Sequence, residues 1–466
     1  MTPLLVTLMV LAALLLLLVL LRKSISPVLG VSLAFMFAFW YVTPVVTTGF
    51  FWERVARSSA IRYDTFVSYA IIEVAGLLGI LFLLAITRPT FRFVTEGKLA
   101  SMTLSPRLMS LAIVAACALE VILRRLTWSM VGGGNYFDQN AFSTRYEGTV
   151  AAANVGIVFS IELVVRAFLY ACAVTPGATR SRLVTILLWS VIIFTSLNEV
   201  LIGGRFALLS PCVLALMYVH MKRISRTVLV ATYAAAAVFV ATVGAIILIS
   251  IAEVRGGNAV TLRDVSRQTQ LVRGKSLGDR LGDLFFHINL KLDAISSGAF
   301  LVQSYGSGVA GMRPYQGAIL SIVPRRILPS KPVPGSVDGT NRGTPARLVP
   351  IAQGLDVDIS NMTVSPAAIS VWQFGLLGLI PLVVLNYLQL CFINSLLVPR
   401  SVFTRTFAML LLTIPSFGGL VASGDFVIMT GERALAMFVA ATLAIVATRF
   451  LFGSRPPVAR PAPRAA

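Results

Sequence analysis

Long apolar runs, separated by short polar segments, dominate this chain. Most of the runs hold about 20 residues, the length that an α-helix needs to cross the hydrocarbon core of a membrane. The pattern predicts an all-α, polytopic membrane bundle of about eleven transmembrane helices with one long external loop. The predicted spans are Pro3–Leu21, Pro27–Val46, Thr65–Ile86, Leu108–Leu123, Val150–Ala173, Leu183–Leu201, Phe206–Val219, Val228–Ile251, Ala367–Leu397, Phe403–Val421 and Ala434–Phe450.

The polar segments divide the chain into four parts. Residues 1–252 hold the first eight spans, 253–363 form the long loop, 364–452 hold the last three spans, and 453–466 form a tail rich in Pro, Arg and Ala. Within the loop, apolar residues in Val260–Phe300 recur at spacings of three and four, which predicts helix. The following segment, PVPGSVDGTNRGTPARL, is expected to be irregular, and the tail is expected to be disordered.

The composition agrees with a membrane protein, since 57% of residues are hydrophobic, 12% are charged and the mean hydropathy is +0.86. A net charge of +20 would suit a nucleic-acid-binding protein. The cations, however, flank the apolar spans, where membrane topology and anionic lipids account for them. We therefore expect membrane lipids as partners and no nucleic acid.

The distribution of Lys and Arg predicts the orientation. If the N-terminus lies outside, every segment expected on the inner side carries cations, and together they carry more than the short outer segments. This topology places the long loop, Glu253–Thr363, on the periplasmic face of a bacterial cytoplasmic membrane and the C-terminus inside.

Cysteine and histidine are sparse and scattered. The four cysteines fall within predicted spans, where they act as small apolar residues, and His220 and His287 lie far apart in the sequence. We therefore expect no metal and no cofactor.

One stretch of the loop, Gly311–Pro332, combines cations with prolines that fix the backbone. Guanidinium groups on a rigid backbone are suited to binding a phosphate or diphosphate. The alternative is an interfacial loop whose cations meet lipid head groups. The candidate diphosphate ligands are Arg313, Arg325, Arg326 and Lys331, with Tyr315 as a further substrate contact.

Charged residues elsewhere add candidates. Glu162 and Arg166 lie four residues apart in the fifth span, so they share a helix face and can pair, either along a substrate path or as a packing contact. Glu73 is a carboxylate within the third span and has the same two interpretations. Arg205 follows Gly203 and Gly204 in a turn at the outer interface, within reach of a lipid-linked phosphate.

Three motifs together carry a family resemblance. They are VPRRILPSKP at Val323–Pro332, SPAAISVWQFGLLGLI at Ser365–Ile380, and the arginine turn Gly203–Arg205. The arrangement resembles the O-antigen polymerases, the Wzy-type oligosaccharide repeat-unit polymerases, most sharply at Arg313–Lys331 and Phe374–Gly375.

The resemblance implies a glycosyltransferase that joins polyprenyl-diphosphate-linked oligosaccharides at the outer face of the membrane, with a flippase and a chain-length regulator as partners. In that family an acidic residue often precedes the Phe-Gly pair, whereas this chain has Ala-Ile-Ser-Val-Trp-Gln there. The general base is therefore unassigned, with four candidates: Asp356, Asp358, Asp283 and His287. Asp356 and Asp358 would also suit a divalent metal, although the chemistry requires none.

Two other functions fit the same pattern. An O-antigen ligase would use a His and Arg pair in the large loop, for which His287 is the candidate. A transporter or flippase would use intramembrane charges such as Glu162 and Arg166, together with two repeated halves, and the sequence has no internal repeat.

Overall fold

The computed structural model shows a bundle of helices. It describes residues 3–45, 62–97, 104–131, 150–179, 181–202, 209–222, 224–239, 242, 246–247, 249–250, 262–276, 278–280, 282–283, 294–314, 320, 330, 332, 336–338, 340–352 and 364–412. Within these residues every regular element is a helix and no strand occurs. The predicted all-α class is confirmed.

The first helices pair along most of their length. They are α1 (Pro3–Leu21), α2 (Pro27–Met36), the π-helical segment η1 (Phe37–Val42), α4 (Tyr63–Ile86) and the short α5 (Arg92–Thr95). Proline stands at the first position of α2, where its missing N–H would have no helical partner. The wider turn η1 continues α2 and buries Tyr41.

The second group of helices follows in the chain, and the outer and last helices come after it. The second group is α7 (Pro106–Val131), α9 (Val150–Val174), α10 (Arg182–Ile202), α11 (Ser210–Lys222) and α12 (Arg226–Phe239). The outer helices are α14 (Leu262–Gly274), α16 (Ala294–Tyr305), η4 (Asn341–Gly343) and α18 (Pro345–Ala352). The last are α19 (Pro366–Phe374), η5 (Gly375–Gly378), α20 (Leu379–Leu397) and α21 (Val402–Leu412).

Five segments are long and apolar enough to cross a membrane: Pro3–Leu21, Pro27–Val45, Tyr63–Ile86, Pro106–Leu126 and Pro366–Leu397. They coincide with five of the predicted spans. Shorter apolar helices occupy Arg182–Asn198, Thr227–Phe239 and Val402–Leu412. The other predicted spans stay predictions, and Ala434–Phe450 lies outside the described residues.

Apolar side chains cover the outside of these helices as well as the inside. Leu18 of α1, Leu111 of α7 and Leu183 of α10 are more than half exposed. A soluble protein would not leave such continuous apolar surface in water, whereas lipid solvates it. These apolar helices identify a membrane-embedded protein.

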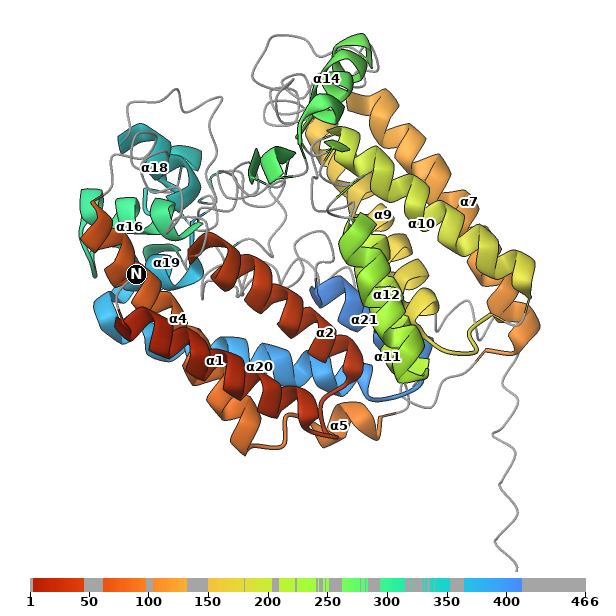
Figure 1. Ribbon diagram of the computed structural model, residues 1–466, viewed down its shortest axis with the longest axis horizontal. Coiled ribbons are helices and arrows are strands. Elements are labelled where there is room, and N and C mark those ends of the chain that lie inside the picture. The colour runs from red at the N-terminus through yellow and green to blue at the C-terminus, as the bar shows by residue number, and fades with distance from the viewer. Residues whose placement is uncertain are drawn as a thin grey trace, which may run out of the picture.

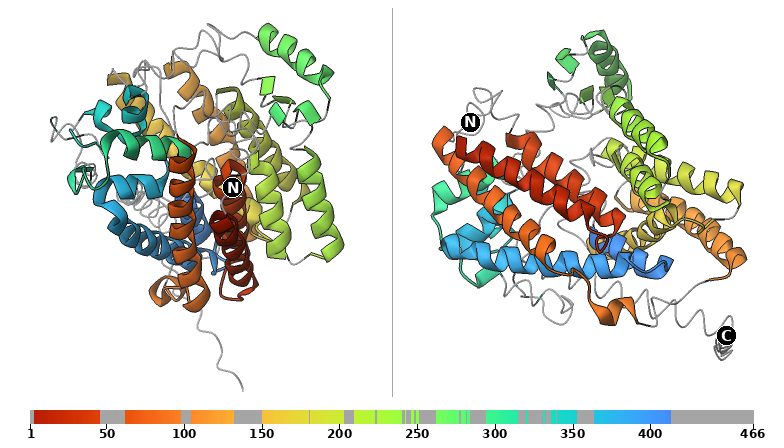
Figure 2. Two further views of the ribbon diagram at one scale, coloured as in Figure 1. Left: turned by 60° about the vertical axis from the view of Figure 1, so that its left-hand side comes forward. Right: turned by 60° about the horizontal axis from the view of Figure 1, so that its bottom comes forward.

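The helices form two groups that diverge toward one end of the molecule (Figure 1). α1, α2, α4 and α20 make one group, and α7, α9, α10 and α12 make the other. α11 packs against α2, and α21 packs against both α9 and α20, so these two helices join the groups. Figure 2 shows the same division from two further directions.

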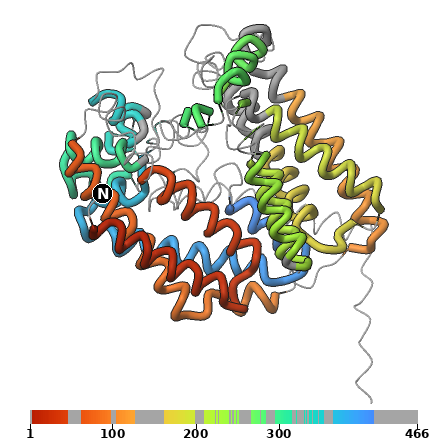
Figure 3. The backbone as a smooth tube through the Cα atoms, viewed as in Figure 1, coloured from red at the N-terminus to blue at the C-terminus, as the bar shows by residue number. Residues whose placement is uncertain are grey.

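α16 and α18 belong to this bundle. α16 packs against α4, α18 and α19. In the tube of Figure 3, α14, α16 and α18 lie at one end of the bundle and α5 lies at the opposite end. The outer segments therefore extend the packing of the spanning helices.

Asn394 connects three segments at the end of the bundle where α5 lies. Its side-chain amide donates to the carbonyl oxygens of Ser24 and Pro89, at 2.8 Å each, and its carbonyl oxygen accepts from the N–H of Ser26 at 2.8 Å. Asn394 is fully buried. It therefore satisfies the backbone of two turns that the apolar bundle would otherwise leave without partners.

Two expectations for the long loop need correction. The predicted helix over Val260–Phe300 is interrupted after α14, which ends at Gly274, and the hydroxyl of Ser276 then caps the next turn by accepting from the N–H of Asp279 at 3.1 Å. The segment expected to be irregular contains η4 and α18. Thr344 followed by Pro345 is a typical helix start, and the carbonyl oxygen of Thr344 accepts from the N–H of Leu348 at 2.9 Å.

The orientation predicted from the cations is testable at two exposed side chains. Met312, in the outer segment, is 60% exposed and Phe93, in α5, is 72% exposed. In a variant without native cysteines, Met312→Cys is expected to react with a membrane-impermeant maleimide in intact cells, whereas Phe93→Cys reacts only after permeabilisation. The reverse pattern would overturn the orientation.

Candidate functional site

A glycine-rich loop binds the end of a broken helix in the outer part of the bundle. The backbone N–H groups of Gly308 and Val309 donate to the carbonyl oxygens of Val371 and Trp372, both at 3.0 Å. The N–H of Gly311 donates to the carbonyl oxygen of Gln373 at 2.9 Å. The loop thus supplies donors to carbonyl groups in the last turn of α19, where the α-helix changes to the 3-10 turn η5 (Gly375–Gly378).

Glycine permits the break itself. Gly375 ends α19 with φ at 65° and ψ at −158°, a conformation that is essentially restricted to glycine. A Cβ atom on Gly378 would overlap with the carbonyl oxygen of Ser370. The predicted span Ala367–Leu397 is therefore divided into α19 and α20, and the Phe-Gly pair singled out in the sequence lies at the division.

Arg313 lies two residues beyond this loop and its side chain is exposed. The loop consequently holds the start of the arginine-rich stretch beside the Phe374–Gly375 break, although about sixty residues separate them in the sequence. The other predicted diphosphate ligands, and the remaining candidate bases, lie outside the described residues: Arg205, Tyr315, Arg325, Arg326, Lys331, His287, Asp356 and Asp358.

A carboxylate meets the other end of α19. Ser365 caps this helix by accepting from the N–H of Ala368 at 3.2 Å. Glu73 of α4 accepts hydrogen bonds from the hydroxyl of Ser365 and from the N–H groups of Ala367 and Ala368. A Cβ atom on Gly298 of α16 would lie 2.7 Å from the Ser365 hydroxyl oxygen, so only glycine allows this close approach.

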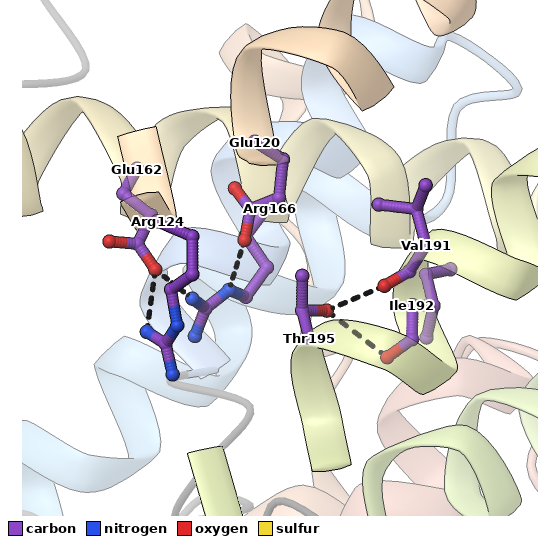
Figure 4. Close-up of polar contacts among 7 residues, drawn as sticks. All are labelled: Glu120, Arg124, Glu162, Arg166, Val191, Ile192 and Thr195. Atoms are coloured by element: carbon purple, nitrogen blue, oxygen red, sulfur yellow. Dashed lines mark hydrogen bonds and ion pairs between the residues drawn. The ribbon is translucent and has the colours of Figure 1, made fainter. Parts of the chain in front are cut away.

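Four buried charges connect α7 with α9 (Figure 4). Arg124 Nη1 binds Glu162 Oε1 at 2.8 Å, and Arg166 Nε binds Glu120 Oε1 at 3.0 Å. Arg166 Nη2 also binds Glu162 Oε1, so the pair expected from the helical spacing is present. The four side chains, named here the charge quartet, alternate in sign and sum to zero.

The charge quartet is enclosed. Its carboxylates are fully buried, and the Arg124 and Arg166 side chains are 7% and 3% exposed. Removing four charges from water is costly, and mutual pairing offsets that cost. Mutual neutralisation and burial favour a role in packing α7 against α9, while a substrate-binding role for Glu162 and Arg166 stays a prediction.

Two acidic residues of the long loop, Asp338 and Asp283, already have hydrogen-bond or ion-pair partners. Burial raises the pKa of Asp338, but hydrogen bonds from Ser336 and Thr340 lower it by more, so the pKa lies below its usual value. The carboxylate is therefore a weaker base than usual. Asp283, a candidate base, pairs with Lys275 at 2.7 Å. Neither carboxylate is therefore free to accept a proton without losing an existing partner.

Metal ligands do not gather within the part of the chain that the structure describes, where no three His, Cys, Asp or Glu side chains come close enough to hold an ion. The four cysteines are free thiols, of which Cys117, Cys172 and Cys391 are buried. The absence of a metal and a cofactor stays a prediction for the whole chain.

Sequence reasoning left several contacts unassigned. Glu120 lies in the predicted span Leu108–Leu123 and Arg124 directly follows that span, and their spacing of four residues is the one that singled out Glu162 and Arg166. The contact of Glu73 with Ser365 has no sequence signal, because the two residues come from helices far apart in the chain. Arg405, counted as an inner cation, is buried and donates to the Thr175 hydroxyl at 2.9 Å.

Comparison of the chain with known protein families, with curated proteins and with solved structures finds no match.

Removing the charge of Glu162 tests the charge quartet. Among the described residues Glu162 is the carboxylate that Arg124 binds, so Glu162→Gln removes that partner, and breaking a buried pair costs about 3–5 kcal/mol. We expect a clearly lowered thermal midpoint for the detergent-purified protein. Asp283→Asn, which removes the partly exposed pair with Lys275, should change stability by about 1 kcal/mol or less. Equal midpoints for both variants would contradict the assignment.

The helix break predicts that a side chain at Gly378 lowers the stability of the protein. Gly378→Ala forces its Cβ atom onto the backbone of Ser370, and backbone shifts of this kind cost about 1–3 kcal/mol. Gly274→Ala is the matched control, because no atom lies within 4 Å of its new Cβ. Size-exclusion profiles after a heating series should separate the two variants. A Gly378→Ala protein as heat-resistant as the control would show that the break is not tightly packed.

Proposed function

We propose that this chain is a membrane glycosyltransferase that joins polyprenyl-diphosphate-linked oligosaccharide repeat units at the outer face of a bacterial cytoplasmic membrane. One observation carries the proposal. The loop that precedes Arg313 is hydrogen-bonded to the helix that ends at Phe374 and Gly375. These are the two parts of the chain in which the resemblance to the O-antigen polymerases is sharpest, and they lie against each other.

The proposed reaction exchanges one glycosidic partner for another. A hydroxyl oxygen of the incoming lipid-linked unit bonds to the anomeric carbon of the growing chain. The bond from that carbon to the diphosphate oxygen breaks, the electron pair leaves with the polyprenyl diphosphate, and a base takes the hydroxyl proton. Because diphosphate is a good leaving group, positioning and charge stabilisation are the main requirements.

Arginine suits both requirements. A guanidinium group offers two parallel N–H donors to phosphate oxygens, whereas an ammonium group offers only a point charge. Arg313 is exposed at the end of a loop whose backbone is fixed by hydrogen bonds to α19. We propose that Arg313 binds the diphosphate together with Arg205, Arg325, Arg326 and Lys331.

A deletion strain distinguishes this function from the two alternatives. Loss of a polymerase leaves lipid carrying a single repeat unit, and loss of a ligase leaves the lipid core uncapped. Loss of a flippase traps lipid-linked units on the inner side of the membrane. Either of the last two profiles would overturn the proposed polymerase.

Arg313→Lys tests the diphosphate contact. The substitution keeps the charge and removes the forked donor, so we expect a loss of about 2–4 kcal/mol of transition-state stabilisation, roughly a hundredfold in rate. Polymer amount and length, measured at equal protein level, report the loss.

Arg342→Lys is the control, because Arg342 is exposed in η4. Arg347, in the same segment, is a poorer control since it is buried. Unchanged polymer in the Arg313→Lys strain would exclude Arg313 from the diphosphate site.

A further inference from the structure

Glu73 is a buried carboxylate that the proposed reaction does not yet use. It lies ten residues into α4, at 5% exposure. Within the described residues no Lys or Arg pairs with it, and one carboxylate oxygen, Oε1, has no partner. A buried carboxyl group without a cation requires another source of compensation.

The first turn of α19 is that source. Its N–H groups at Ala367 and Ala368, together with the Ser365 hydroxyl, point to the Glu73 carboxylate. The positive end of a helix dipole stabilises a negative charge at this position. The contact is mutual, because the same hydrogen bonds hold the helix to α4.

The other end of α19 carries the proposed site. The helix has only nine residues, so its two ends move together as one short rigid body. Its last carbonyl groups bind the loop Gly308–Gly311, which leads into Arg313. Gly298 of α16 lies against Ser365 and Ala368 at the start of α19, where a Cβ atom would overlap with both side chains.

We propose that Glu73 is a positioning residue of the transferase: its carboxylate fixes the first turn of α19 and thereby the place of the Gly308–Gly311 loop and Arg313 at the opposite end. The consequence for activity rests on the proposed function. The consequence for the position of the loop does not, because it follows from the hydrogen bonds at the two ends of α19.

Spin labels measure the position directly. In a cysteine-free protein, labels at Met312 and at Phe82 of α4, which are 60% and 52% exposed, report the distance from the loop to α4. We expect one narrow distance distribution in the parent and a broader or displaced one in Glu73→Ala and Glu73→Gln. Asp64→Asn is the control, since Asp64 is an exposed carboxylate of the same helix, α4.

Polymer formation from lipid-linked units in proteoliposomes provides the second measurement. In Glu73→Ala and Glu73→Gln, loss of a hydrogen bond to a charged group should reduce the rate of polymer formation about tenfold, mainly through a higher KM. Glu73→Asp, which keeps the charge, should recover part of the loss.

The outcomes separate the two proposals. Displaced labels in the Glu73 variants, together with a parent protein that forms no polymer from lipid-linked units, would sustain the positioning role and overturn the transferase. Unchanged distances in both Glu73 variants, or displacement in Asp64→Asn as well, would overturn the positioning role. Lost activity with unchanged distances would also overturn it, because Glu73 would then act without moving α19.

Discussion

Backbone groups within a membrane must find their hydrogen-bond partners inside the protein, and the outer part of this bundle depends on that constraint. The break at Gly375 frees carbonyl groups at the end of α19, which then need donors from elsewhere in the protein. The glycine-rich loop that follows α16 supplies them through Gly308, Val309 and Gly311. The break and the loop are therefore one structural unit, and neither would be stable without the other.

Buried charge is compensated in two different ways in the same bundle. In the charge quartet, two carboxylates and two guanidinium groups neutralise one another between α7 and α9. Glu73 instead uses the backbone and the capping hydroxyl of a short helix. The first arrangement connects two long helices side by side. The contact of Glu73 connects the spanning helix α4 to α19, the helix against which the candidate site packs, and under our proposal this contact fixes the position of the site.

Several features could be predicted from the sequence because they depend on local patterns. Apolar length identified α1, α4 and the other long spans, since a helix must be about 20 apolar residues long to cross a bilayer. Four-residue spacing identified the Glu162–Arg166 pair, because such residues share a face of any helix. The Phe374–Gly375 pair and Arg313 were singled out as motifs, although without any indication that they lie together.

Contacts between distant segments were decided by the tertiary structure alone. Apolar length predicted the span Ala367–Leu397, and Pro366–Leu397 is long and apolar enough to cross a membrane. The helix break within it, with Gly378 packed on Ser370 and the loop hydrogen-bonded to α19, does not follow from apolar length. Asn394 gives no sign in the sequence that it ties the turns at Ser24 and Pro89. Local pattern determined which segments are helices and which face is apolar, because both follow from residue spacing. Which helix end meets which carboxylate or loop depends on satisfying buried polar groups, and that requires partners that only the folded chain brings together.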